Sequence, residues 1–249
     1  MTQQRQSFLG LPLDTGYSIT DLCNLLGKTG ECRLITFITA DTWASAAKKP
    51  EYIAQLEKMT AVIPAGMDVA CALKKITGND TSAICFEMHS LAAPFFKAAI
   101  ENKNSIMLVG GEPAFDERVQ DKLLIAFPEL KIISTINGYG DFAPKITRVT
   151  EKNPDCVLVD FDGPRTIAFM LALKDAGYKG LVINSNGFFE ETLQDDDFYP
   201  GWAKRWSIFF AYRLLAQPKT LLPKFIADYP AFAVPAIKAL ADKYIPKKN

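Results

Sequence analysis

Two strand-to-helix junctions carry carboxylates that could do chemistry. The segment AVIPAGMDV, residues 61–69, reads as an apolar strand, a turn that contains Gly66, and a helix start that contains Asp68. The segment RLITFITAD ends in the same way at Thr39 and Asp41. Open α/β sheets bind their ligands at the carboxyl ends of parallel strands, so we expect these residues at one edge of a sheet. Asp41 could act as a general base toward a hydroxyl group, or could cap the helix that follows it.

Two further junctions could hold a phosphate group. In LVGGEP a buried strand ends at Gly110 and Gly111, where a ligand can approach the backbone and the next helix start favours an anion. In LVDFDGPRT the turn contains Gly163, Pro164 and Arg165, and an arginine at a helix start can bind a phosphate bidentately. Each turn could equally be a tight connection, with Arg165 paired to a neighbouring acid. The chain contains neither a GxGxxG nor a GxxxxGK[ST] pattern, so it carries no dinucleotide or P-loop fingerprint.

The composition argues against several kinds of site. The chain has one histidine, His89, and five cysteines without CxxC spacing, which argues against a zinc site and a disulfide framework. Reduced thiols in a cytosolic protein are the simplest interpretation. His89 has no GxSxG elbow to support a hydrolase triad. We therefore expect no metal and no cofactor.

The elements that must position these residues alternate between strand and helix over the first 190 residues. RLITFITA, AVIP, SIMLVGG, LKIISTI, CVLVDF and LVINSNG read as strands, as do FLGLPLD and SAICFEM. Helices are expected between them, including one over TWASAAKKPEYIAQLEKM and a short one opened by a capping box at Ser18 and Asp21. This alternation predicts an α/β protein with a mostly parallel sheet covered by helices on both faces.

The pattern changes after residue 199. WAKRWSIFFAYRLLAQP reads as a long helix, and the prolines at 223, 230 and 235 predict broken helices after it. From residue 200 onward there are nine Lys and Arg against two Asp, a net charge of +7. We therefore predict an α/β domain over residues 1–199 and a basic helical appendage over 200–249. The appendage would meet a phosphate or an anionic membrane surface, the plainer alternative being a solvated helix face. We expect no signal peptide before the first strand and no apolar run long enough to span a bilayer.

The order of these segments resembles the WecG/TagA/CpsF glycosyltransferases. FLGLPLD is similar to the family's opening "ilGvpid", TAD to its "TlNae" and IPAGMDV to its "lpDGigv". MLVGGEPAFDERVQDKLLIAFPELKIISTINGYGDF is similar to "fllGGkpgvaeraaekL…yPgLkivg…GyF", and PDCVLVDFDGPRTI to "pDlvlVglGsPkQE". NGFFE corresponds to "GgaFD", and YPGWAKRWSIFFAYRLLAQPKT to the ending "aPkw…EWlyRLl.eP.R". The similarity runs from about Phe8 to Phe232.

The resemblance implies an inverting, metal-independent transfer of a sugar from a UDP-sugar to a polyprenyl-diphosphate-linked acceptor in bacterial surface-polysaccharide synthesis. It implies a Rossmann-like fold and a C-terminal appendage that engages the membrane and helps to close the site. The protein would be cytoplasmic and peripherally associated with the inner face of the cell membrane. Its partners would be the donor, the acceptor and an anionic membrane surface, with a homo-oligomer as an open alternative and no nucleic acid.

The resemblance also implies roles for single residues. The residues that would surround the nucleotide are Gly110, Gly111, Tyr139 and Glu190. Thr39 and Asp41 would lie beside the donor sugar, and Arg213 would belong to the appendage. The remaining candidate binding residues are Gly66, Gly163, Pro164 and Arg165.

The chain departs from the family pattern at several polar positions. Ala65 stands where the family keeps the Asp of its "DG" turn, and Glu87 is the nearest acid in the segment that corresponds to "tGsDl". Thr166 and Ile167 replace the family's "QE", and Asp41 replaces the Asn of "TlN". The base could therefore be Asp41, or Asp68 three positions beyond Ala65. The alternatives to an active transferase are a non-catalytic relative that binds a sugar nucleotide or scaffolds an assembly complex, and an unrelated α/β enzyme.

Overall fold

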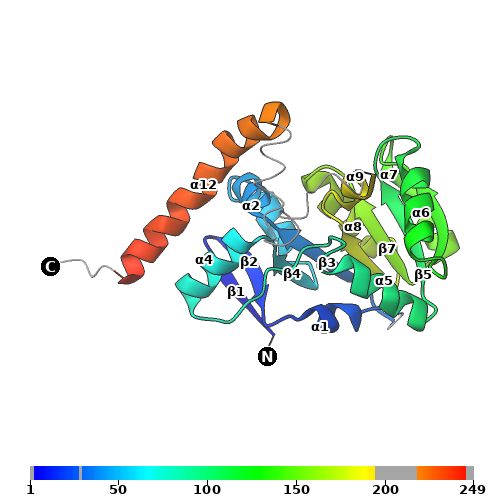
Figure 1. Cartoon of the computed structure of the whole chain (residues 1–249), viewed down its shortest axis with the longest axis horizontal. Helices are drawn as coiled ribbons and strands as arrows, with labels where there is room; N and C mark the ends of the chain where they lie inside the picture. Colours follow the sequence, from blue (N-terminus) through cyan, green and yellow to red (C-terminus); the bar gives the residue numbers. More distant parts are fainter. Residues whose placement is uncertain (1–2, 28–29, 194–217, 245–249) are drawn as a thin grey trace.

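A six-stranded parallel sheet forms the centre of the molecule (Figure 1). The computed structural model describes residues 3–27, 30–193 and 218–244. The strand order is β4-β3-β8-β7-β5-β6, and every neighbouring pair is parallel. The strands are β3 (Arg33–Ile38), β4 (Ala61–Pro64), β5 (Ser105–Gly110), β6 (Lys131–Ile136), β7 (Cys156–Asp160) and β8 (Leu181–Asn184). The predicted α/β architecture, Rossmann-like with a parallel sheet, is confirmed.

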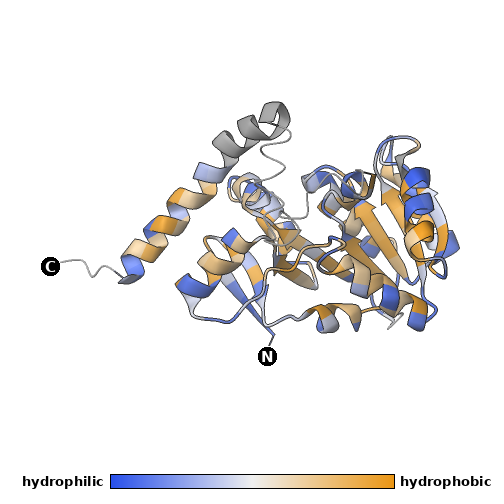
Figure 2. Cartoon of the chain, viewed as in Figure 1, coloured by the Kyte–Doolittle hydropathy of each residue, from blue (hydrophilic) through white to orange (hydrophobic). Residues whose placement is uncertain are grey.

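Two hydrophobic cores, one on each face, explain why these segments form a sheet. Along β3, Leu34 and Ile38 belong to one core and Ile35 and Phe37 to the other, because successive side chains of a strand point to opposite faces. Strands buried on both faces read as continuous apolar runs, which colour the sheet orange in Figure 2.

Helices cover both faces of the sheet. One core receives side chains from α2 (Ala40–Ala46), α3 (Pro50–Leu56), α4 (Met67–Thr77), α7 (Phe142–Lys152) and α8 (Pro164–Asp175). The other receives them from α1 (Ile19–Cys23), α5 (Ala92–Glu101), α6 (Phe115–Ala126) and α9 (Phe188–Leu193). The capping box predicted for α1 is confirmed, because the Ser18 side chain accepts from the Asp21 amide at 3.1 Å and Asp21 accepts from the Ser18 amide at 2.8 Å.

The N-terminal segment differs from its prediction. FLGLPLD is not one strand but the turn and second strand of a hairpin, formed by β1 (Gln4–Phe8) and β2 (Leu11–Thr15). Both turn residues, Leu9 and Gly10, have positive φ, which is the conformation that a two-residue hairpin turn requires. The Asp14 carboxylate accepts from the Val62 amide at 2.6 Å, so the hairpin is tied to β4.

Two other predicted elements are also wrong. SAICFEM, residues 82–88, forms no strand, and its apolar side chains serve the core instead: Phe86 is buried and packs edge-on against Phe188 at 5.2 Å. The single helix predicted over residues 42–59 divides into α2 and α3, because Pro50 starts a new helix at its first turn.

The C-terminal part of the described chain is one helix, α12 (Pro218–Tyr244), of 27 residues. The prediction of broken helices is therefore wrong for this segment. Prolines cost helix stability, but α12 packs against α2 and α4, and tertiary packing of a helix face can outweigh intrinsic propensity. Phe232 is buried against Trp43, with ring centroids 5.5 Å apart. The helix predicted over 202–218 lies outside the described residues except for Pro218, as does Arg213.

Candidate active site

The strand order creates a switch point between β5 and β7. From β5 the chain moves outward to β6, whereas from β7 it moves in the opposite direction to β8. Gly110, the last residue of β5, lies in register with Asp160, the last residue of β7. Ligands of open α/β sheets bind in the crevice outside such a point. The turns after Gly110 and Asp160 are thus neighbours, as the sequence predicts.

The backbone at this switch point is too close for side chains. A Cβ on Gly110, whose φ is +142°, would lie 2.1 Å from the carbonyl oxygen of Asp160. The Gly111 amide donates to the same oxygen at 3.0 Å, and the Gly138 amide donates to the Gly111 carbonyl at 2.8 Å. The ends of β5, β6 and β7 are therefore joined by main-chain hydrogen bonds. Gly110 is required by this close approach, whatever ligand binds above it.

Arg165 lies at the same crevice, at the first turn of α8. Its guanidinium carbon is 5.5 Å from the ring centre of Phe142 and 5.2 Å from that of Phe161, and Nη2 donates to the Gly140 carbonyl at 2.7 Å. Among the described residues these contacts fix the side chain, and the predicted alternative of an Asp162–Arg165 ion pair is not formed. Arg165 remains exposed, so its charge is available to an anion.

The loop before α7 is held from below by a buried lysine. Lys145 is 5% exposed, and its Nζ donates to the carbonyl of Tyr139. Burial and the nearby charge of Arg165 lower the pKa of Lys145. Tyr139 itself is 58% exposed beside the crevice, so its ring is free to meet a ligand. Gly163 and Pro164, also exposed, begin α8 next to Arg165.

Asp160 is a positioning residue that the sequence did not single out. One carboxylate oxygen accepts from the Gly187 amide at 3.0 Å and the other from the Phe189 amide at 2.7 Å. Burial raises the pKa of Asp160, and the charge of Glu190 raises it further. Asp160 thus fixes the start of α9 and places Glu190 near the end of β7. The signal in the sequence was an acid at the end of an otherwise apolar strand, CVLVD.

The second group of candidates lies at the ends of β3 and β4, where Ile38 is in register with Pro64. Thr39 is the N-cap residue of α2, and Asp41 lies in its first turn. The Thr39 hydroxyl bonds to the Asp41 carboxylate and lies 2.9 Å from the Thr42 hydroxyl. Asp41 is exposed. Because Thr39 occupies the N-cap position, Asp41 does not have the capping role that the sequence left open.

Asp68 lies beside this group, at the start of α4. Its Oδ1 accepts from the Val69 amide at 2.8 Å and lies 2.6 Å from where a Cβ on Gly66 would be, so the glycine gives the carboxylate its space. Tyr229 of α12 also hydrogen-bonds to Asp68. Burial raises the pKa of Asp68, and the charge of Asp41 adds to the rise. The two acids are therefore electrostatic neighbours, whereas Ala65 is completely buried and presents no group to a ligand.

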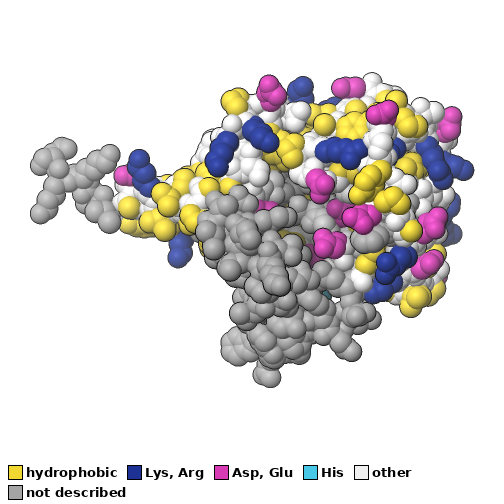
Figure 3. All heavy atoms as spheres, turned by 90° about the horizontal axis from the view of Figure 1, so that it is seen from above, with side chains coloured by type: hydrophobic (Ala, Val, Ile, Leu, Met, Phe, Trp, Pro, Cys, Tyr) yellow, Lys and Arg dark blue, Asp and Glu magenta, His cyan; other side chains and the backbone are white. Residues whose placement is uncertain are grey.

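The structure divides the predicted residues into two groups separated by β8. The first, the carboxylate group, consists of Thr39, Asp41, Gly66 and Asp68. The second, the glycine group, consists of Gly110, Gly111, Tyr139, Gly163, Pro164, Arg165 and Glu190. Figure 3 shows acidic side chains gathered near the middle of the upper face. Within the described residues no set of three or more His, Cys, Asp or Glu side chains could hold a metal ion. His89 lies 3.8 Å from Glu191 and belongs to neither group.

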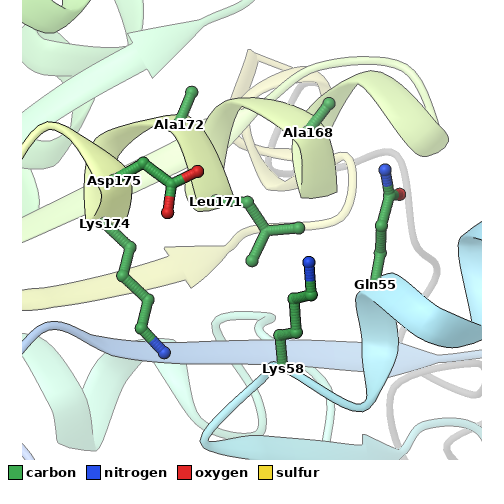
Figure 4. A pocket seen from close by; sticks show the side chains of 7 residues that line it. All are labelled: Gln55, Lys58, Ala168, Leu171, Ala172, Lys174 and Asp175. Atoms are coloured by element: carbon green, nitrogen blue, oxygen red, sulfur yellow. The ribbon is translucent and has the colours of Figure 1, made fainter.

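A groove of about 330 Å³ lies elsewhere, between α3 and α8 (Figure 4). It is lined by Gln55, Lys58, Ala168, Leu171, Ala172, Lys174 and Asp175. Lys174 and Asp175 end α8, and a helix that returns between parallel strands ends at their amino edge. The groove therefore faces away from the switch point, and none of the predicted residues lines it.

Comparison with known proteins agrees with this arrangement. The model of the Glycosyl transferase WecG/TagA/CpsF family matches residues 6–245. A UDP-Gal:alpha-D-GlcNAc-diphosphoundecaprenol beta-1,4-galactosyltransferase from Shigella boydii is 25% identical over 177 residues, which cover 70% of this chain and 74% of that protein. The family match spans both groups of candidate residues and α12. The resemblance seen in the sequence is confirmed, and the chain belongs to the WecG/TagA/CpsF family of glycosyltransferases.

Proposed function

We propose that this glycosyltransferase moves a sugar from a UDP-sugar to a polyprenyl-diphosphate-linked acceptor at the carboxyl edge of its sheet. The observation that carries the proposal is the exposed carboxylate of Asp41 at one end of an edge whose other end is a glycine-lined switch point. A base and a phosphate-binding crevice on one edge are what sugar transfer from a nucleotide requires. The substrates named for the Shigella boydii relative, UDP-Gal and a GlcNAc-diphosphoundecaprenol, support the choice of donor and acceptor.

The glycine group would bind the donor. The main chain at Gly110 and Gly111, which carries no side chains, lets a diphosphate approach closely, and the exposed guanidinium of Arg165 can bind it. The uracil base could stack on the exposed ring of Tyr139. The exposed carboxylate of Glu190 could accept hydrogen bonds from the hydroxyls of the nucleotide's ribose. Arg165 would also offset the negative charge that develops on the departing UDP, which is the task a metal ion has in other transferases. This supports a metal-independent reaction.

The carboxylate group would act on the acceptor. In the proposed step, Asp41 takes the proton of the acceptor hydroxyl while the hydroxyl oxygen forms a bond to the anomeric carbon. The bond from that carbon to the diphosphate oxygen of UDP breaks, and UDP leaves with the electron pair. Attack from the face opposite the leaving group inverts the anomeric configuration. The separation of the two groups by β8 supports this geometry, since base and diphosphate must lie on opposite sides of the sugar.

We also propose that residues 200–249 form the appendage that meets an anionic membrane surface, with 1–199 as the catalytic domain. Within the described residues no helix is long and apolar enough to cross a membrane. The exposed side of α12, however, carries an apolar stripe at helical spacing: Pro230, Val234 and Ile237. Val234 and Ile237 are each 64% exposed, and Lys238 lies beside them. In Figure 3 the projecting end of α12 shows yellow side chains flanked by lysines. Such a face suits a bilayer with anionic lipids.

The transfer is tested by a radiolabelled assay with UDP-sugars and a lipid-linked GlcNAc diphosphate. Asp41→Asn should lower kcat at least about 100-fold, because general-base catalysis contributes that much or more. Glu51→Gln changes an exposed acid of α3 and is the matched control, with wild-type activity expected. A thermal-shift titration with UDP should raise the melting temperature of both variants, since binding to the folded state stabilises it. UDP binding without any transfer would contradict the proposal and leave a non-catalytic nucleotide-binding protein.

The membrane contact is tested by cosedimentation with vesicles that contain phosphatidylglycerol. The double variant Val234→Ser and Ile237→Ser should remain in the supernatant, whereas the wild type should pellet. Ile125→Ser, on α6, removes a side chain that is 81% exposed outside the stripe and should pellet like the wild type. Equal pelleting of the double variant would exclude this face as the contact.

A further inference from the structure

We infer that Tyr229, on α12, is a positioning residue for the transfer and acts through Asp68. The inference rests on the proposed function and goes beyond it by assigning different tasks to the two neighbouring carboxylates. Asp41 is exposed and available to an acceptor, whereas Asp68 is engaged by a tyrosine from a distant part of the chain. Asp68 then serves to dock α12 at the catalytic edge instead of taking a proton.

The contacts of α12 show why Tyr229 is held in place. Three residues after it, Phe232 is only 3% exposed and packs on Trp43, with the ring planes at 70°, and on Phe8 at 6.5 Å. Residues three apart lie on the same side of a helix, so the anchored ring of Phe232 directs the Tyr229 hydroxyl to the same surface. Trp43 lies two residues after Asp41 in α2. One turn of α12 therefore touches both helices that begin at the two carboxylates.

The groups around Asp68 explain why a hydrogen bond from Tyr229 stabilises it. Those that face Asp68 are the Val69 amide on α4, the Tyr229 hydroxyl on α12, the negative charge of Asp41 on α2, and the Cys85 thiol, which is desolvated nearby. A half-buried carboxylate next to another acid needs donors to remain stable in its place. Among these four groups, only the Tyr229 hydroxyl is a side-chain donor that comes from α12, far away in the sequence. Without it, the repulsion between the two carboxylates would push Asp68 and Asp41 apart and change the position of the proposed base.

The test is a double-mutant cycle with Tyr229→Phe and Asp68→Asn in the full-length protein. Tyr229→Phe keeps the ring and removes only the hydroxyl, so we expect kcat to fall about 10- to 100-fold, the cost of misplacing a reacting group. The KM for the UDP-sugar should not change, because the donor binds at the other end of the edge. If Tyr229 acts through Asp68, the double variant should be no slower than the slower single variant.

Tyr244→Phe is the matched control. The Tyr244 hydroxyl lies on the same helix and bonds to the Lys75 carbonyl at 3.2 Å, away from the catalytic edge, so its loss should leave kcat unchanged. Hydrogen exchange at the Val69 amide, which needs no activity, should speed up in Tyr229→Phe and not in Tyr244→Phe. Wild-type kcat in Tyr229→Phe, or additive effects in the double variant, would overturn the inference and leave the proposed function intact. A wild-type protein with no transfer would overturn both.

Discussion

The two ends of the carboxyl edge of the sheet are built in different ways. At the ends of β5, β6 and β7, the structure is set by the main chain: the Gly111 amide donates to the Asp160 carbonyl, the Gly138 amide donates to the Gly111 carbonyl, and Gly110 packs closely against Asp160. At the ends of β3 and β4, it is set by side chains, above all by contacts that reach Asp68 and Trp43 from α12. The close main-chain contacts at Gly110 leave no room for a larger residue. At the other end, where side chains make the contacts, one residue can be substituted for another without moving the backbone.

This difference matches the departures that the resemblance in the sequence implies. In that resemblance, Ala65 and Asp41 stand in place of an Asp and an Asn and lie at the side-chain end, whereas the matching glycines at 110 and 111 lie at the backbone end. The departures at the backbone end serve structure: Thr166 is buried, and its hydroxyl donates to the Phe161 carbonyl at 2.7 Å, while Ile167 belongs to the core. Close packing thus constrains the backbone end of the edge, whereas the side chains at the other end can vary.

The largest expected effect comes from filling the backbone end. Gly110→Ala should destabilise the protein by about 3 kcal/mol, because its Cβ would overlap the Asp160 carbonyl and the strand ends must move apart. UDP binding should be lost at temperatures where the variant is still folded. Gly177→Ala also places a side chain at positive φ, +82°, but with no atom within 4 Å, and should cost only about 1 kcal/mol. Urea denaturation measures both, and equal costs would show that the close approach is not tight.

Asp160→Asn should come next, at about 2 kcal/mol, because the amide NH2 group cannot accept from the second backbone donor, whereas both carboxyl oxygens, ionised or protonated, keep acceptor capacity. The effect should depend on pH. Burial raises the pKa of Asp160 above 3.8, so between 3.8 and its folded value the native state binds more protons than the unfolded state. Asp160 therefore favours folding below this window, and its contribution declines as pH rises through it.

The measurement is urea denaturation of both proteins from pH 3.5 upward. The advantage of the wild type over Asp160→Asn should be largest at low pH and shrink as pH rises. An advantage that grows with pH would mean that the carboxylate is stabilised, not destabilised, in its charged form.

A smaller effect is expected at Arg165. Arg165→Met should raise the KM for the UDP-sugar about 10-fold, the cost of one charge-assisted contact to a diphosphate. Arg165→Lys keeps the charge but loses the planar stacking between Phe142 and Phe161, so its KM should lie between those of the wild type and the methionine variant. Steady-state kinetics decide the order. If the two variants have the same KM for the UDP-sugar, donor binding depends on the planar shape of the guanidinium and not on its charge.

The smallest effect is expected at the far end of α12. Lys243 donates to the carbonyls of Lys75 and Ile76 at 2.9 and 3.0 Å, at the C-terminal end of α4. A cation at that position complements the helix dipole, so Lys243→Met should cost about 0.5 to 1 kcal/mol in urea denaturation. Lys238→Met, on the exposed side of α12, should cost less. A larger loss for Lys238 would contradict the capping role of Lys243.

The central sheet could be predicted from the sequence because strands buried on both faces leave long apolar runs. The same signal failed for SAICFEM, where Phe86 is apolar because it fills the core and not because it pairs in a sheet. Prolines suggested breaks in α12, since local propensity contains no information about the packing of Phe232 on Trp43. The candidate residues were found from strand ends and glycines, but the roles of Asp160 and Tyr229 depend on partners 27 and 161 positions away.

The unbroken α12 fixes an orientation as well as a contact. Tyr229 touches the start of α4 and Lys243 touches its end, and at 1.5 Å per residue the two points are about 21 Å apart along the axis. A helix attached at two points that far apart cannot pivot about either of them. Under the proposed membrane contact, the stripe along α12 lays the helix flat on the bilayer, so the α/β domain attached to it is held at a single tilt. The height of Asp41 above the lipid then follows from that tilt.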